Sequence, residues 1–136
     1  LGRSQLKRLE QNIERRQSLA RRYREELRDL PIKFQESDLA EGSQISHAYH
    51  LFVIQTERRK ELYDNLKSHQ IFTQVHYIPL YKHPYFAGLL GDIKLDGAEK
   101  YYKGCLSIPI FPELSSDDQE KIILELKNFL NIEDTI

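Results

Sequence analysis

The chain has 136 residues, of which 40% are hydrophobic and 30% charged, and this length and composition suit one compact domain with a single core. Its 20 basic and 21 acidic side chains leave a formal net charge of -1, which excludes a global attraction to nucleic acid or anionic lipid. A single cysteine, Cys105, excludes an internal disulfide, and no apolar run approaches the roughly 20 residues that span a bilayer, so we expect a soluble, cytoplasmic protein.

The first thirty residues predict one long amphipathic helix. Apolar side chains recur three or four positions apart, with arginines between them. Pro31 is expected to end this helix, which would be roughly 45 Å long, more than a domain of this size needs for its own core. We therefore expect part of its apolar stripe to pack on something outside the chain. The stripe consists of Leu6, Leu9, Ile13, Leu19, Tyr23, Leu27 and Leu30.

Two strands and a helix are expected next. Residues 32–34 predict a short strand, and residues 36–44 have the polar composition of a loop. Residues 47–55 are rich in aromatic and β-branched side chains and predict the clearest strand of the chain. Thr56 then stands where its hydroxyl can cap a helix that reaches Ser68.

The second half of the chain predicts one more strand and two more helices. Residues 71–78 predict a strand that Pro79 ends, and residues 80–96 an aromatic, glycine-bearing loop with about one turn of helix. Residues 97–105 predict a short helix, while residues 106–130 combine an apolar run with serines and aspartates that suit the start of a final helix. The predicted fold class is α+β, a long N-terminal helix followed by a small, mostly antiparallel sheet covered by helices on one side.

Several kinds of chemistry are not indicated. His47 and His50 would point to opposite faces of a strand, so no metal site is predicted. Cys105 lacks a recognisable nucleophile context and is expected to be a buried structural residue. Over residues 1–30, nine basic side chains are interleaved with five acidic ones, which favours a solvated helix face over nucleic-acid binding.

One segment, QVHYIPLYKHPYF at residues 74–86, is a candidate site. It gathers two histidines, four aromatic residues and two prolines after a predicted strand, where a turn can expose polar side chains at a pocket rim. An aromatic packing loop would explain the same composition. If the strand persists, His76 and Tyr77 point to opposite faces, so at most one faces a ligand through the sheet. The candidate substrate-binding residues are His76, Tyr77, Tyr81, His83 and Tyr85.

Four stretches cover nearly the whole chain: LGRSQLKRLEQNIERRQSLARRYREEL, HAYHLFVI, VHYIPLYKHPYF and LSIPIFPELSSDDQEKIILELKNFL. In this order and spacing they resemble the C-terminal portion of the sugar aminotransferases of the DegT/DnrJ/EryC1/StrS family. The resemblance implies a fold-type I enzyme that uses pyridoxal phosphate. It also implies transfer of an amino group, usually from glutamate, to the keto carbon of a nucleotide-linked deoxysugar.

The resemblance also implies that catalytic residues and scaffold residues lie in different domains. In the family, a large N-terminal domain carries the Schiff-base lysine, the aspartate that pairs with the pyridinium nitrogen and most phosphate contacts, and all of these would precede this chain. Residues 1–30 would then be a connecting helix and residues 31–136 a small C-terminal subdomain. We expect no catalytic or cofactor-binding residue here, no activity in the chain alone, and a homodimer without nucleic-acid or membrane partners.

Within the candidate segment, His76 resembles a family histidine that contributes to the substrate pocket, often across the dimer interface. Where many relatives read P-L-H, this chain reads PLY, with Tyr81 in place of histidine, and this leaves the contacts to sugar and nucleotide open. The wording VHYIPLY is closest to the transaminases of the pseudaminic acid pathway, which act on a UDP-linked 4-keto sugar.

Two alternatives to an aminotransferase remain. Some members of the family replace the Schiff-base lysine and act as dehydratases, and the deciding position is absent from this chain. The other alternative is an interaction module without cofactor, in which the basic first helix pairs with a partner helix.

Overall fold

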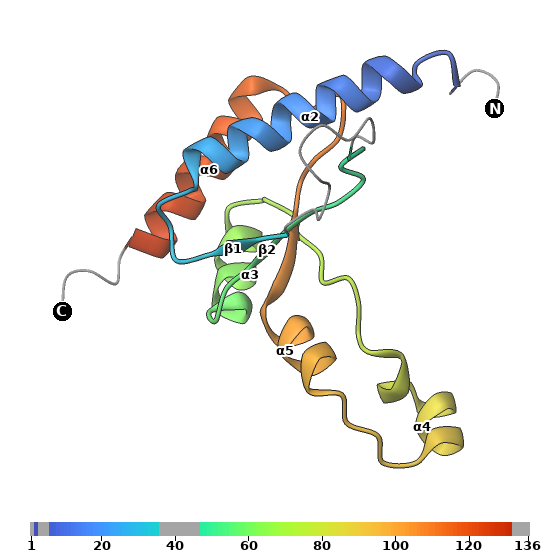
Figure 1. The fold of residues 1–136 in the computed structure, drawn as a ribbon. Helices are drawn as coiled ribbons and strands as arrows, with labels where there is room; N and C mark the ends of the chain where they lie inside the picture. Colours follow the sequence, from blue (N-terminus) through green and yellow to red (C-terminus); the bar gives the residue numbers. More distant parts are fainter. Residues whose placement is uncertain (1, 3–5, 36–46, 132–136) are drawn as a thin grey trace.

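The computed structural model describes residues 2, 6–35 and 47–131 (Figure 1). Its helices are α2 (Leu9–Glu26), α3 (Arg59–Ser68), α4 (Pro84–Leu90), α5 (Asp96–Gly104) and α6 (Ser116–Leu130), with a 3-10 turn η1 (Leu80–Lys82). Its strands are β1 (Lys33–Phe34), β2 (Phe52–Gln55) and β3 (Cys105–Ile108). No helix in this described part is both long and apolar enough to cross a membrane.

The three strands form one small antiparallel sheet in the order β1-β2-β3. Phe52 lies opposite Ile108 and Ile54 opposite Leu106, so these four side chains share one face of the sheet. All four are buried in the main core together with side chains from α2, α3 and α6. The α+β fold with a small antiparallel sheet is therefore confirmed, and α2, α3 and α6 cover this face.

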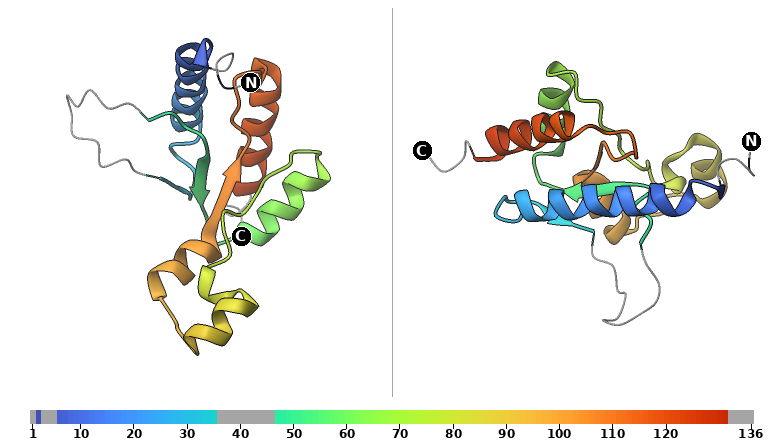
Figure 2. Two further views of the ribbon diagram at one scale, coloured as in Figure 1. Left: turned by 90° about the vertical axis from the view of Figure 1, so that its right-hand side faces the viewer. Right: turned by 90° about the horizontal axis from the view of Figure 1, so that it is seen from above.

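Helices α2 and α6 lie side by side, although they come from the two ends of the described chain (Figure 2). Their contact is partly polar: the buried Gln119 side chain donates from Nε2 to the carbonyl oxygen of Leu19 at 2.9 Å. Ion pairs join Arg22 to Glu120 and Lys127 to Glu26 along the rim. Such a pairing fixes the register of the two helices as well as burying apolar surface.

The start of α6 follows the sequence prediction closely. The Ser115 hydroxyl accepts a hydrogen bond from the backbone N–H of Asp118 at 3.0 Å, and Asp117 and Asp118 occupy the first turn. The Thr56 hydroxyl accepts a hydrogen bond from the backbone N–H of Arg58 at 3.3 Å, but this bond lies in the turn before α3 and not at its first residue. A capping side chain therefore explains where α6 begins, whereas the prediction that Thr56 caps α3 is wrong, because α3 begins at Arg59 without a side-chain cap.

The first helix is shorter than expected. Helix α2 has 18 residues, or about 27 Å, and ends at Glu26; turns follow at Leu27 and Leu30, and Leu30, as the residue before Pro31, disfavours helical geometry. Leu27 and Leu30 are buried in the core, whereas Leu6 and Leu9 are 69% and 47% exposed. Only the C-terminal part of the apolar stripe packs within the chain, and an external partner for the rest stays a prediction.

Two strand predictions are wrong in extent. Of residues 47–55 only Phe52–Gln55 form a strand, because Tyr49 takes a positive φ of 45° and the chain bends before β2. Residues 71–78 form no strand but a single bridge between Gln74 and Ser107. Two residues after that bridge, the side chain of His76 contacts the side chain of Ser107.

Helices η1 and α4 and the start of α5 project away from the body of the domain (Figure 1). We call residues 80–95 the arm. Neither η1 nor α4 contains a buried residue. The exposed large apolar side chains of the arm are Leu80, Tyr85, Leu89, Leu90, Ile93 and Leu95. Because a helix of seven residues is marginal in water by itself, this arrangement favours packing of the arm against another surface.

Candidate functional site

The half-buried His76 lies over the face of the sheet that the core helices do not cover. Its Nδ1 is 2.8 Å from the hydroxyl oxygen of Ser107, a 6% exposed residue of β3. No described residue bonds the other ring nitrogen, Nε2. Because one nitrogen is held by a buried hydroxyl, the ring has a fixed orientation and offers its second nitrogen to a ligand.

Cys105 lies beside His76 on the same face. Its thiol is buried and contacts the carbonyl oxygens of His76 and Tyr102 at 4.0 and 3.9 Å. Burial raises the pKa of this thiol above its usual range, which disfavours the reactive thiolate. The expected burial of Cys105 is therefore confirmed.

A second polar cluster joins η1 to α5. Glu99 accepts hydrogen bonds from the Tyr81 hydroxyl at 2.8 Å and from the Lys82 ammonium at 2.5 Å. Lys82, and after it Tyr81, holds the pKa of Glu99 below its usual value, while the hydrogen bond to Glu99 raises the pKa of Lys82. Desolvation and the Glu99 carboxylate raise the pKa of Tyr81. The cluster therefore stays in its charged-pair form near neutral pH.

The five predicted substrate residues do not converge. His76 and Tyr77 make an edge contact with ring centroids 4.7 Å apart, and Tyr81 turns toward Glu99 instead. His83 precedes α4 and is exposed, and Tyr85 is 73% exposed and contacts the ring of its neighbour Phe86. His76 thus lies at the sheet with Tyr77 beside it, and Tyr81 is hydrogen-bonded at the base of the arm. His83 and Tyr85 are exposed on the arm.

Three residues at this site were not predicted: Ser107, Glu99 and Lys82. Lys82 lies inside the candidate segment, but Ser107 and Glu99 are 31 and 18 residues from their partners. The apolar run around Ser107 predicted only a buried segment, and a serine inside it was the one available signal of a polar contact.

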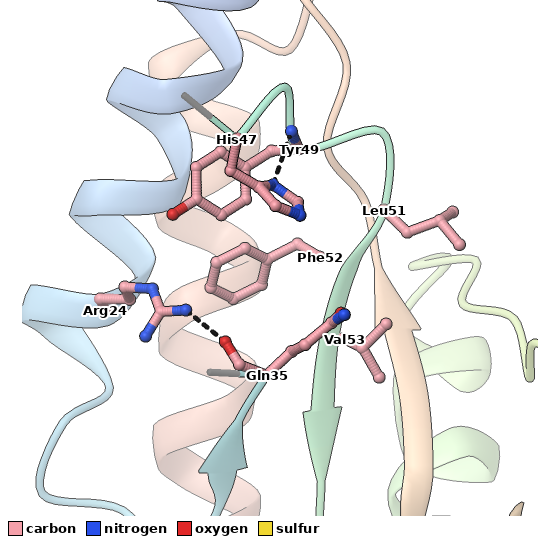
Figure 3. A pocket seen from close by; sticks show the side chains of 7 residues that line it. All are labelled: Arg24, Gln35, His47, Tyr49, Leu51, Phe52 and Val53. Atoms are coloured by element: carbon pink, nitrogen blue, oxygen red, sulfur yellow. Dashed lines mark hydrogen bonds between the residues drawn. The ribbon is translucent and has the colours of Figure 1, made fainter. Parts of the chain in front are cut away.

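A hollow of about 110 Å³ lies at the start of β2, beside α2 (Figure 3). The Arg24 guanidinium donates to the carbonyl oxygen of Gln35 at 2.6 Å, and the backbone N–H of Tyr49 donates to Nδ1 of His47 at 3.0 Å. These polar groups already have partners within the chain. The residues that line the hollow are Arg24, Gln35, His47, Tyr49, Leu51, Phe52 and Val53.

Two larger hollows lie elsewhere, and none of the three is lined by a predicted substrate residue. One, of about 390 Å³, lies between α3 and the Gln74 segment. The other, of about 730 Å³, lies between the start of β1, the start of α3 and the end of α5. Among the described residues, no group of three or more His, Cys, Asp or Glu side chains is arranged to hold a metal ion.

The described residues do not fit the pyridoxal phosphate that the resemblance implies. A lysine that anchors this cofactor needs a desolvated or electropositive site that lowers its pKa. The described lysines are exposed except Lys127, which is half-buried and paired with Glu26. The hydrogen bond from Lys82 to Glu99 moves its pKa upward, in the opposite direction. None of the described lysines is therefore suited to anchor this cofactor.

Comparison with known proteins gives one consistent result. The sequence profile described as "DegT/DnrJ/EryC1/StrS aminotransferase family" matches residues 1–127. The spore coat polysaccharide biosynthesis protein SpsC of Bacillus subtilis is 34% identical over 139 aligned positions, which cover 96% of this chain and 35% of SpsC. A UDP-4-amino-4,6-dideoxy-N-acetyl-beta-L-altrosamine transaminase of Campylobacter jejuni is 35% identical, covering 87% of this chain and 32% of the relative.

Solved structures agree with the sequence relatives. The aminotransferase TlmJ of Streptoalloteichus hindustanus superposes with a TM-score of 0.86 at 25% identity, over 96% of this chain and 35% of TlmJ. The chain thus spans about a third of the length of these relatives.

Proposed function

The chain belongs to the DegT/DnrJ/EryC1/StrS aminotransferase family, and from this premise we propose that it is the small C-terminal domain of a pyridoxal-phosphate-dependent sugar aminotransferase. The proposed reaction moves an amino group from glutamate to the keto carbon of a nucleotide-linked 4-keto-deoxysugar. The match over residues 1–127, at about a third of the length of the relatives, carries this proposal. The name of the Campylobacter relative supports a UDP-linked substrate.

In this proposal the cofactor supplies the electron sink and is held by a large domain. The residues of this chain position the sugar. His76 offers Nε2 to a hydroxyl or phosphate oxygen of the substrate, while Ser107 fixes the ring through Nδ1. Tyr77, which is 72% exposed beside that ring, provides an apolar face for the sugar.

The same proposal assigns the remaining surfaces. Residues 1–30 connect the two domains, and the exposed Leu6 and Leu9 lie against the large domain. The apolar side chains of the arm pack against that domain or against the second subunit of a homodimer, because an exposed cluster of this size favours an interface. Tyr81, tied to Glu99, supports the arm, and His83 and Tyr85 contact the substrate only if the arm closes over it.

The test uses the enzyme that contains this chain together with its large domain. Amino transfer from glutamate to a UDP-linked 4-keto sugar is followed by product analysis, with release of water as the sign of a dehydratase. His76→Ala should lower kcat/KM for the sugar about tenfold and leave cofactor absorbance and melting temperature unchanged. The matched control is His69→Ala, because His69 follows α3 and its ring lies 3.7 Å from Glu125 of α6.

The two roles of His76 give different outcomes. A lowered melting temperature with unchanged sugar kinetics would show that His76 only packs the sheet. Failure to transfer an amino group from any donor, with an intact fold, would refute the aminotransferase itself.

A further inference from the structure

The hollow of about 730 Å³ gathers positive charge that the proposed function does not use. It is lined by four basic side chains, Lys33, Arg58, Lys100 and Lys103, and by one acidic side chain, Glu57. The chain as a whole carries a formal net charge of -1, so this is a local excess. In the part of the chain that the structure describes, none of the three lysines forms an ion pair.

Secondary structure explains why these charges meet. Lys33 starts β1, while Lys100 and Lys103 lie one helical turn apart on α5. Glu99, their neighbour on α5, points to the other side and binds Tyr81 and Lys82. The hollow and the Glu99 cluster therefore lie on different sides of α5, and the hollow shares no residue with the His76–Ser107 contact.

Backbone geometry adds to the attraction for an anion. Glu57 and Arg58, the two residues just before α3, border the hollow, and the N-terminus of a helix carries a partial positive charge. Gly104 lets the end of α5 approach β2, since a Cβ at this position would lie 3.3 Å from the carbonyl oxygen of Thr56. The backbone N–H of Thr56 donates to the Gly104 carbonyl at 3.1 Å, and this bond joins the two segments at the hollow.

The opposite wall is apolar. Pro31, Ile32 and Leu130 line the hollow beside the lysines. Its volume of about 730 Å³ falls within the range of about 300–1,000 Å³ that is usual for small-molecule sites. A bare inorganic ion would leave this wall without a contact, whereas an organic phosphate would use both walls.

From these observations we infer that the hollow binds a small organic phosphate. Lys33, Lys100 and Lys103 contact the phosphate group, and the apolar wall contacts the organic part. The inference does not depend on the proposed aminotransferase function. It gives the chain a second anion site, separate from any substrate pocket at His76.

Phenyl phosphate is the probe, titrated into the chain by calorimetry at fixed ionic strength, with inorganic phosphate titrated in parallel. We expect saturable binding of one phenyl phosphate per chain and weaker binding of inorganic phosphate. The double variant Lys100→Gln, Lys103→Gln should weaken phenyl phosphate binding about tenfold. The control Lys67→Gln, Lys121→Gln removes the same charge from exposed positions outside the hollow and should bind like the unaltered chain.

Each contrary result overturns a stated part of the inference. Equal weakening in both double variants would mean a diffuse charge effect, and the lack of saturable binding by the unaltered chain would remove the site. Inorganic phosphate binding as tightly as phenyl phosphate would overturn the role of the apolar wall. A His76→Ala variant should bind normally, and loss of binding there would place the phosphate elsewhere.

Discussion

Removal of one hydroxyl should reveal whether Ser107 acts through His76. Ser107→Ala deletes the oxygen that lies 2.8 Å from Nδ1 and leaves the ring free to turn. A hydrogen bond of this kind contributes about 1 kcal/mol net, which corresponds to roughly a fivefold loss of kcat/KM if the whole effect reaches the transition state. Ser107→Thr keeps a hydroxyl at the same position and should retain most of the activity.

A double-mutant cycle separates positioning from packing. Sugar kinetics and the free energy of unfolding are measured for Ser107→Ala, His76→Ala and the double variant in the complete enzyme. If Ser107 acts through His76, its replacement should have no further effect on kinetics once His76 is absent. Additive kinetic losses in the double variant would refute the positioning role, and so would unchanged kinetics in Ser107→Ala alone. Nitrogen shifts of the His76 ring in the chain report the same contact without any assay of turnover.

Three further predictions concern the core, the Glu99 cluster and the arm. Ile123→Ala removes a fully buried side chain from α6 and should lower the free energy of unfolding by about 2–5 kcal/mol in urea titration, whereas Leu124→Ala, at a 48% exposed position beside it, should cost much less. Glu99→Gln should lower the pKa of Tyr81 toward that of an ordinary tyrosine, read by ultraviolet absorbance, and an unchanged Tyr81 titration would contradict the assigned cause. Because the pKa of Glu99 is held low, its contribution to stability is present above the unfolded pKa and lost as pH falls through the folded one, so the acid-side decline of stability should be weaker in Glu99→Gln. Leu89→Asp in the exposed arm should reduce self-association of the chain in sedimentation without a change in helicity, and strict monomers of the unaltered chain at high concentration would contradict an interface there.

The sequence predicts features that depend on nearby residues. Ser115 predicts the start of α6 because a capping serine bonds a backbone N–H only three residues later. The bend at Tyr49 and the loss of strand pairing after Gln74 have no such local signal, since they depend on where β3 lies. Composition likewise singled out His76, but the partner that orients it comes from a strand 31 residues later. Spacing on α5 alone could not show that Glu99 and Lys100 face different sites.

The pairing of α2 with α6 has a consequence for synthesis on the ribosome. The bond from Gln119 to Leu19 joins residues 100 positions apart, and α6 supplies several of the side chains that cover α2 and the sheet. At about 5–20 residues per second, translation would leave the apolar side of α2 without its partner for roughly 5–20 seconds. During that interval the nascent domain presents a natural target for chaperones, and a ribosome stalled before α6 would hold a chain that cannot complete its core.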